Sequence, residues 1–251
     1  NMQDTYIGDE GKGFPLVLVH GFLGSSKMWK PQIDFFKYHF RVITPDLPGF
    51  GRSNKAKSHN SIQSIANLLL DCLEEKKIDK FHLLGHSMGG MIVQEMAKKS
   101  GGKISKLVCY STGPKGEMPG RFETVDQSRE NIKKNGLEVT AKNIAQTWFV
   151  LGEKAKYFDL CLEAGKQTSI EAADNALIAI KNWDGVKNLQ DIKNNTLIIW
   201  GDKDKSYNLE QVQTLEKNIS DSNLVIFKGC AHNVHLEQPD QFNHTIKDFL
   251  L

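Results

Sequence analysis

The chain has 251 residues, of which 39% are hydrophobic and 25% charged, and its formal net charge is +2. This length and composition indicate a globular protein with one large domain, or one domain that carries an insertion. The nearly balanced charge argues against nucleic acid or an acidic membrane surface as a partner, and no apolar run reaches the length of a membrane span.

The four cysteines form no C-x-x-C pair and show no metal-ligand spacing: they are Cys72, Cys109, Cys161 and Cys230. Cys109 lies in an apolar run, and Cys72 lies on the apolar side of a predicted helix, so both are expected to be small core residues. No signal-peptide pattern is present. We therefore expect reduced thiols, a cytoplasmic location and no metal or other cofactor.

The first 113 residues alternate between strand and helix patterns. An edge strand is expected around Thr5–Ile7. Apolar, β-rich runs predict strands at 15–19, 40–44, 81–86 and 104–110. Helical spacing predicts helices at 28–36, at 61–76 and after the third of these runs, to about residue 99. Strands that alternate with helices predict a parallel sheet with helices on both faces.

The alternation stops at residue 114 and resumes after residue 184. Between these points the sequence has a start rich in Gly and Pro and then helical periodicity at 125–134, 137–149, 157–162 and 169–183. Strands return at 196–200 and 224–227, and helices at 209–217 and 239–251. We predict an α/β core of residues 1–113 and 185–251 with a helical cap, residues 114–184, inserted. Such a cap either excludes water and shapes the substrate site or is a structural excursion.

Residues 85–89 read Gly-His-Ser-Met-Gly, between a predicted strand and a predicted helix. This is the context of a nucleophile elbow, in which a serine occupies a strained strand-to-helix turn. Glycines two residues away on each side let the turn close, because they have no side chain. We predict that Ser87 is a nucleophile at a helix N-terminus, whose N–H groups favour developing negative charge.

A serine hydroxyl needs a base, and the base needs an orienting acid. Both residue types follow later strands: Asp202 or Asp204 is the candidate acid, and His232 or His235 is the candidate base. The chain order Ser, Asp, His is the order expected for this type of elbow. The residue pattern leaves the choice within each pair open.

An oxyanion hole is expected from two backbone N–H groups, those of Met88 and Phe22. Phe22 belongs to a glycine loop that follows the buried strand at 15–19. The candidate pocket residues are His20, His86, Trp148, Phe149 and Trp183. Each has a structural alternative: His20 ties the glycine loop to nearby backbone, His86 packs beside the elbow, and the aromatic residues are core.

The segments 20–25, 46–53, 85–90, 201–204 and 232–239 together resemble the α/β-hydrolase superfamily. The resemblance implies a mostly parallel sheet flanked by helices, with an inserted helical cap. In this superfamily the strand after the cap ends Gly-x-x-Asp, and the last residue is the acid, which implies Asp204. The histidine lies five residues before a Glu that precedes x-Pro, which implies His232. So few residues precede the strand at 15–19 that the family's first strand is expected to be missing.

Several branches of the superfamily are similar to this chain. The helical cap resembles that of 3-oxoadipate enol-lactonase-like enzymes, and small carboxylesterases share the same motifs. The 46–53 loop also resembles hydrolases that cleave C–C bonds in meta-cleavage products. The start of the 20–26 loop is similar to a menaquinone-pathway lyase, but the usual Tyr and Arg of that lyase are replaced here by His86 and Met91.

We therefore expect a serine hydrolase that acts on a small carboxylic ester or lactone through an acyl-enzyme on Ser87. One alternative keeps the site but changes the reaction to C–C bond hydrolysis or a lyase step. Another is a ligand-binding receptor that retains a slow triad. A small molecule is the expected partner, and the pattern carries no signal for the oligomeric state.

Overall fold

A seven-stranded sheet forms the centre of the protein in a computed structural model that describes residues 2–251, so that residue 1 of the expected core lies outside it. The strand order is β1-β3-β2-β4-β5-β6-β7. The strands are β1 (Ile7–Glu10), β2 (Pro15–Val19), β3 (Arg41–Pro45), β4 (Phe81–His86), β5 (Ile104–Tyr110), β6 (Asn195–Gly201) and β7 (Ser222–Phe227). All neighbouring pairs are parallel except β1 with β3. The expected parallel sheet is confirmed, and its edge strand begins two residues later than the expected Thr5.

Strand β2 shows why the apolar runs are continuous. Its side chains alternate between the two faces of the sheet, as strand geometry requires. Leu16 and Leu18 pack in one core cluster, and Val17 and Val19 pack in the other. Since both faces are covered by helices, both sets of side chains must be apolar.

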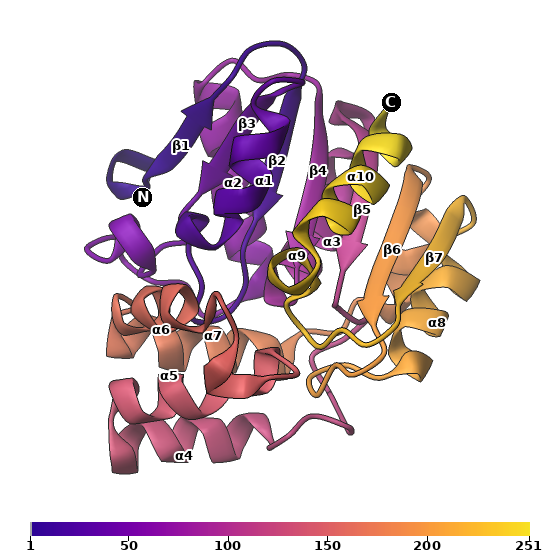
Figure 1. Ribbon diagram of the computed structural model, residues 1–251. Coiled ribbons are helices and arrows are strands. Elements are labelled where there is room, and N and C mark those ends of the chain that lie inside the picture. The colour runs from indigo at the N-terminus through magenta and orange to yellow at the C-terminus, as the bar shows by residue number, and fades with distance from the viewer. Residues whose placement is uncertain (1) are drawn as a thin grey trace.

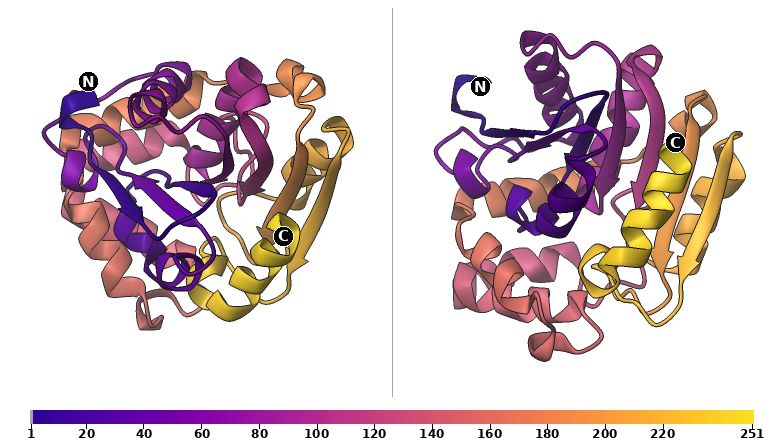
Figure 2. Two further views of the ribbon diagram at one scale, coloured as in Figure 1. Left: turned by 90° about the horizontal axis from the view of Figure 1, so that it is seen from above. Right: turned by 45° about the horizontal axis from the view of Figure 1, so that its top comes forward.

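Helices cover the two faces of the sheet (Figures 1 and 2). α1 and α10 cross one face, and α2, α3 and α8 lie on the other. The core helices are α1 (Lys30–Phe36), α2 (Ile62–Glu75), α3 (Met88–Ser100), α8 (Leu209–Asn218), α9 (Val234–Glu237) and α10 (Pro239–Leu250). The short α9 was not expected from the sequence pattern. No helix in the described part of the chain is both long and apolar enough to cross a membrane.

The segment between β5 and β6 is helical, as expected (Figure 1). Its helices are α4 (Val125–Asn135), α5 (Leu137–Ala145), α6 (Phe158–Lys166) and α7 (Ile170–Asn182). The start of α4 is fixed by a capping box, in which Thr124 and Gln127 bond each other's backbone N–H groups. These helices lie beyond the carboxyl ends of the strands and join the core cluster on the α2–α3 face.

The two ends of this helical segment are held side by side. Gly116 N donates to the Trp183 carbonyl (2.8 Å), and Gly185 N donates to the Pro114 carbonyl (2.8 Å). The Trp183 indole Nε1 also donates to Oε2 of Glu95 on α3 (2.9 Å), in a buried contact. The segment therefore leaves and re-enters the α/β core at one place, next to α3.

Candidate active site

Ser87 stands between β4 and α3 in a strained backbone conformation, with φ 59° and ψ −119°. Residues other than glycine rarely adopt positive φ, and they keep it only where the surroundings enforce it. Here Ser87 N donates to the Tyr110 carbonyl (3.0 Å), and Thr112 Oγ1 donates to the Ser87 carbonyl (2.7 Å). The strained turn expected from Gly-x-Ser-x-Gly is present.

The glycines on either side of Ser87 allow a close approach of backbones. A Cβ atom on Gly85 would collide with the carbonyl of Gly89, and a Cβ on Gly89 would collide with the carbonyl of Val19. Neither glycine has positive φ. Their role is therefore to let α3 pack directly against β4 and β2, which places Ser87 at the carboxyl edge of the sheet.

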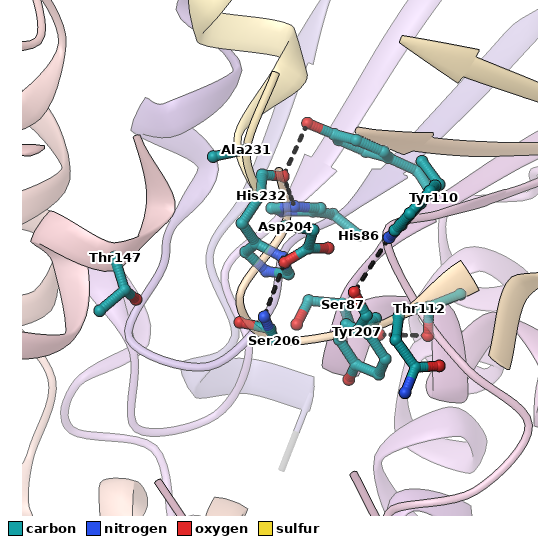
Figure 3. Close-up of polar contacts among 12 residues, drawn as sticks. His86, Ser87, Tyr110, Thr112, Thr147, Asp204, Ser206, Tyr207, Ala231 and His232 are labelled. Carbon is teal, nitrogen blue, oxygen red and sulfur yellow. Dashed lines mark hydrogen bonds and ion pairs between the residues drawn. The ribbon is translucent and has the colours of Figure 1, made fainter. Parts of the chain in front are cut away.

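His232 and Asp204 form a buried pair (Figure 3). His232 Nδ1 lies 3.1 Å from Asp204 Oδ1 and 3.2 Å from Oδ2, with side chains only 4% and 0% exposed. Ser206 N also donates to Asp204 Oδ1 (2.8 Å). Asp202 instead accepts a hydrogen bond from Gly229 N and is exposed. The residue pattern did not choose between Asp202 and Asp204 as the acid. Of these two, only Asp204 contacts a candidate base, His232.

His235 belongs to a buried layer behind His232. Its Nδ1 lies 2.7 Å from the Tyr110 hydroxyl, and burial lowers the pKa of His235 to about 3. The same hydroxyl contacts the His232 carbonyl (3.3 Å), to which His86 Nε2 also donates (3.1 Å). Burial lowers the pKa of His86 well below its usual value. These neutral rings support the backbone of His232 from behind.

Ser87 and His232 line one small chamber, which has a volume of about 30 Å³. Phe22 and His86 also line it. Six residues of the helical segment complete the wall: Met118, Arg121, Phe122, Ile144, Trp148 and Ile180. This space holds about one or two water molecules. The chamber is therefore enclosed by the α/β core on one side and by the helical segment on the other.

The two backbone groups expected to form an oxyanion hole lie beside Ser87. Met88 is the first residue of α3, so its N–H is outside the helical hydrogen-bond ladder. A Cβ atom on Gly21 would lie 3.1 Å from Ser87 Cβ and 3.3 Å from Met88 N, so the Gly21–Phe22 loop packs against the elbow. Within residues 2–251, no hydrogen bond is assigned to Phe22 N. The catalytic role of these groups stays a prediction.

Three of the five candidate pocket residues do not line the chamber. His20 Nε2 accepts a hydrogen bond from Leu47 N (3.0 Å), and its Nδ1 donates to the Gly21 carbonyl (2.8 Å), so it ties two loops together. Phe149 is buried in the core. Trp183 is also buried, with its indole bonded to Glu95. His86 and Trp148 do line the chamber, as expected.

Tyr207 is a chamber residue that the sequence pattern did not reveal. Its hydroxyl interacts with the side chains of Ser87 and Thr112, and its ring stacks on that of His232 with centroids 6.0 Å apart. Burial raises the pKa of Tyr207, so the phenol stays neutral. The only signal in the sequence is its position three residues after Asp204, in the same loop. Arg121, in the Gly- and Pro-rich start of the helical segment, was also missed.

Glu237 connects the histidine loop to the helical segment. Its Oε1 accepts from Ala231 N (2.6 Å), and its Oε2 accepts from Val150 N (2.8 Å). Burial raises the pKa of Glu237, and these two N–H groups oppose that effect. Glu237, the residue from which the resemblance implied His232, therefore holds the histidine loop and the helical segment together. Across residues 2–251, no group of three or more His, Cys, Asp or Glu residues could hold a metal ion.

Comparison with known proteins identifies the family. A model described as the alpha/beta hydrolase fold matches residues 15–239. The chain belongs to this family. It is 29% identical to a pimeloyl-[acyl-carrier protein] methyl ester esterase of Legionella pneumophila, over 98% of this chain and 99% of the relative. It is 28% identical to a 2-hydroxy-6-oxo-6-phenylhexa-2,4-dienoate hydrolase of Burkholderia cepacia, over 98% and 90%.

Solved structures share the fold of this α/β hydrolase. The crystal structure of the enol-lactonase from Burkholderia xenovorans LB400 superposes with a TM-score of 0.91, covering 98% of this chain and 96% of the other at 22% identity. This likeness concerns the fold alone. Together with the curated relatives, the family match makes the chain a hydrolase of the α/β-hydrolase family.

Proposed function

We propose that this α/β hydrolase cleaves a small carboxylic ester or lactone through an acyl-enzyme on Ser87. The proposal is carried by one observation: the strained Ser87 and His232, which is buried against Asp204, line the same small chamber. The Legionella pneumophila relative is a methyl ester esterase, which supports the same reaction class. We assign residues 114–184 as the cap, with 1–113 and 185–251 as the core.

In the first half-reaction, His232 takes the proton of Ser87 Oγ as that oxygen attacks the carbonyl carbon. Asp204 holds the imidazole in one orientation and stabilises its protonated form. The carbonyl oxygen becomes an oxyanion, which accepts hydrogen bonds from the N–H groups of Phe22 and Met88. The C–O bond to the alcohol then breaks, and His232 gives its proton to the leaving alkoxide.

In the second half-reaction, water attacks the acyl-enzyme. His232 removes a proton from this water, a second oxyanion forms in the same position, and Ser87 leaves with the proton that His232 returns. The product is a carboxylic acid, or a hydroxy acid when the substrate is a lactone. The cap residues that close the chamber keep bulk water away from the first intermediate.

Replacing the nucleophile tests the proposal directly. Ser87→Ala should lower kcat/KM for a p-nitrophenyl ester by about 10³- to 10⁶-fold, because the attacking hydroxyl is gone. A fluorophosphonate probe should label the wild-type protein at Ser87 and leave the variant unlabelled, as peptide mass spectrometry would show. Ser220→Ala, at an exposed serine, is the matched control and should change neither result. Undiminished turnover in Ser87→Ala would refute the assignment.

A second reaction is supported by the Burkholderia cepacia relative, whose substrate is a dienoate rather than an ester. We infer that C–C bond hydrolysis by the same residues is the alternative. A panel that pairs p-nitrophenyl esters and lactones with vinylogous diketones separates the two reactions. A kcat/KM for a diketone that exceeds every ester and lactone would replace the first proposal with this one.

A further inference from the structure

Arg121 is an arginine in the chamber wall that forms no direct ion pair in the described part of the chain. It lines the same chamber as Ser87. Among residues 2–251, no carboxylate forms an ion pair with it, whereas Arg41 pairs with Asp9 (2.7 Å) and Arg129 pairs with Asp174 (2.8 Å). The Glu123 carboxylate acts on Arg121 through its charge without forming an ion pair with the guanidinium, and this offsets only part of the cost of burying the cation.

The hydrogen bonds of Arg121 leave one edge of its guanidinium open. Nη1 donates to the Glu123 carbonyl (2.8 Å) and to Ser128 Oγ (2.9 Å). Nε and Nη2 have no acceptor assigned within residues 2–251. These two atoms form an edge with two parallel N–H groups, the arrangement that binds both oxygens of a carboxylate.

The nearby carboxylates are engaged elsewhere. Glu123 Oε2 accepts from Asn131 Nδ2 (2.7 Å), and Glu117 lies 3.3 Å from Lys115. Burial lowers the pKa of Arg121, and the nearby Tyr207 and Glu123 oppose this effect without cancelling it. An arginine nevertheless stays charged in proteins, so a positive charge remains in the wall.

Arg121 lines two cavities. The chamber of about 30 Å³ and a cleft of about 410 Å³ are both lined by Met118 and Arg121. The chamber is too small for an acyl group and an alkoxy group together. A substrate whose carbonyl lies at Ser87 needs further space, and the cleft, which Glu117, Glu123, Asp126 and Lys181 also line, shares Met118 and Arg121 with the chamber.

The position of Arg121 relative to the triad residues is fixed by the chain around it. Phe122 N donates to the Lys205 carbonyl (2.9 Å), next to Asp204 in the loop after β6. The guanidinium carbon lies 4.4 Å from the centre of the Phe122 ring. The arginine is thus attached to the same loop that carries the proposed acid, and its distance from the reacting carbonyl is constrained.

We propose that Arg121 is a carboxylate-binding subsite, so that the substrate is an ester or lactone carrying a second, ionised carboxylate. The carboxylate oxygens accept hydrogen bonds from Nε and Nη2 while the reacting carbonyl lies at Ser87. This inference rests on the proposed function and names its substrate class.

The test compares half-esters with their neutral isosteres. Monoethyl succinate, glutarate and adipate are each paired with the ethyl ester in which a carboxamide replaces the free carboxylate. In the best-fitting pair, wild-type kcat/KM should favour the carboxylate by about tenfold to a hundredfold, the value of charge-assisted hydrogen bonds. Arg121→Gln should bring this ratio close to one. Arg52→Gln, at an exposed arginine over the Tyr6 ring, should leave the ratio as in the wild type.

Binding separates this inference from the proposed function. Glutarate or adipate should raise the thermal melting temperature of Ser87→Ala but not that of Ser87→Ala with Arg121→Gln. If the diacids stabilise Ser87→Ala in this way but the wild-type protein hydrolyses no ester, the hydrolase proposal alone would be refuted. Equal turnover of acid and amide, or a preference that survives in Arg121→Gln, would overturn the subsite alone. If Arg121→Gln fails to fold by circular dichroism, Arg121→Lys decides: loss of the bidentate edge should still reduce the ratio.

Discussion

At the scale of single residues, the two carboxylates after β6 have the same chemistry but different surroundings. Asp204 is buried against His232 and accepts from Ser206 N, whereas Asp202 is exposed and accepts from Gly229 N. An acid that orients an imidazole must be desolvated and must contact its Nδ1. Only Asp204 satisfies both conditions, although the two residues are separated by a single lysine.

This difference gives a matched pair of variants. Asp204→Asn should lower kcat/KM by about 10³- to 10⁴-fold, because an amide can hold the imidazole in the wrong tautomer and cannot stabilise its charged form. Asp202→Asn should stay within about twofold of the wild type, since its contact is structural and exposed. Steady-state kinetics on one p-nitrophenyl ester, with circular dichroism of each protein, measures both. Equal losses in the two variants would contradict the assignment of the acid.

At the scale of elements, the contact of α3 with the sheet depends on glycine. Gly89→Ala would push a methyl group against the Val19 carbonyl, and backbone atoms of a central strand cannot move aside cheaply. The free energy of unfolding should fall by about 2–4 kcal/mol. Gly102→Ala is the control, because a Cβ there meets nothing within 4 Å. It should be neutral or slightly stabilising, as urea denaturation followed by circular dichroism would show.

Helices and strands were predictable from the sequence where burial gives their apolar residues a regular spacing. The continuous run 15–19 could only be a strand covered on both faces, and α2 carries a complete apolar face. Ser87 was predictable because a strained turn between a strand and a helix leaves glycines at fixed spacing. Tyr207 and Arg121 were not, because a side chain that enters a site from a loop obeys no period. Trp183 was expected to line the pocket, but its side chain contacts Glu95 on α3 instead of lining the chamber.

At the scale of the whole molecule, buried neutral histidines make stability depend on pH. The pKa of His235 is lowered to about 3 by burial, against about 6.5 in an unfolded chain. Below about pH 6.5 the unfolded state therefore binds a proton that the folded state does not, and this favours unfolding. The stabilisation is complete above about pH 6.5 and is lost as the pH falls towards 3.

Urea denaturation at pH 7, 6 and 5 should show a free energy of unfolding that falls with pH, by up to about 1.4 kcal/mol per pH unit for each such histidine. His235→Gln removes one titrating group and should make the dependence shallower. His244→Gln, at an exposed histidine, should reproduce the wild-type slope. An unchanged slope in His235→Gln would show that His235 is not held neutral by the fold.

The paired ends of the helical segment have a consequence for how this enzyme can diversify. Gly185 N donates a hydrogen bond to the Pro114 carbonyl, so the residues between them form a loop whose two ends are held together at the sheet. β5 and β6 pair directly with each other over five residue pairs, from Lys106 with Asn195 to Tyr110 with Ile199. A replacement segment of another length, joined at the same two points, would present a new wall to Ser87. Selection can thus redesign what the enzyme accepts while the parts that break the bond are inherited unchanged.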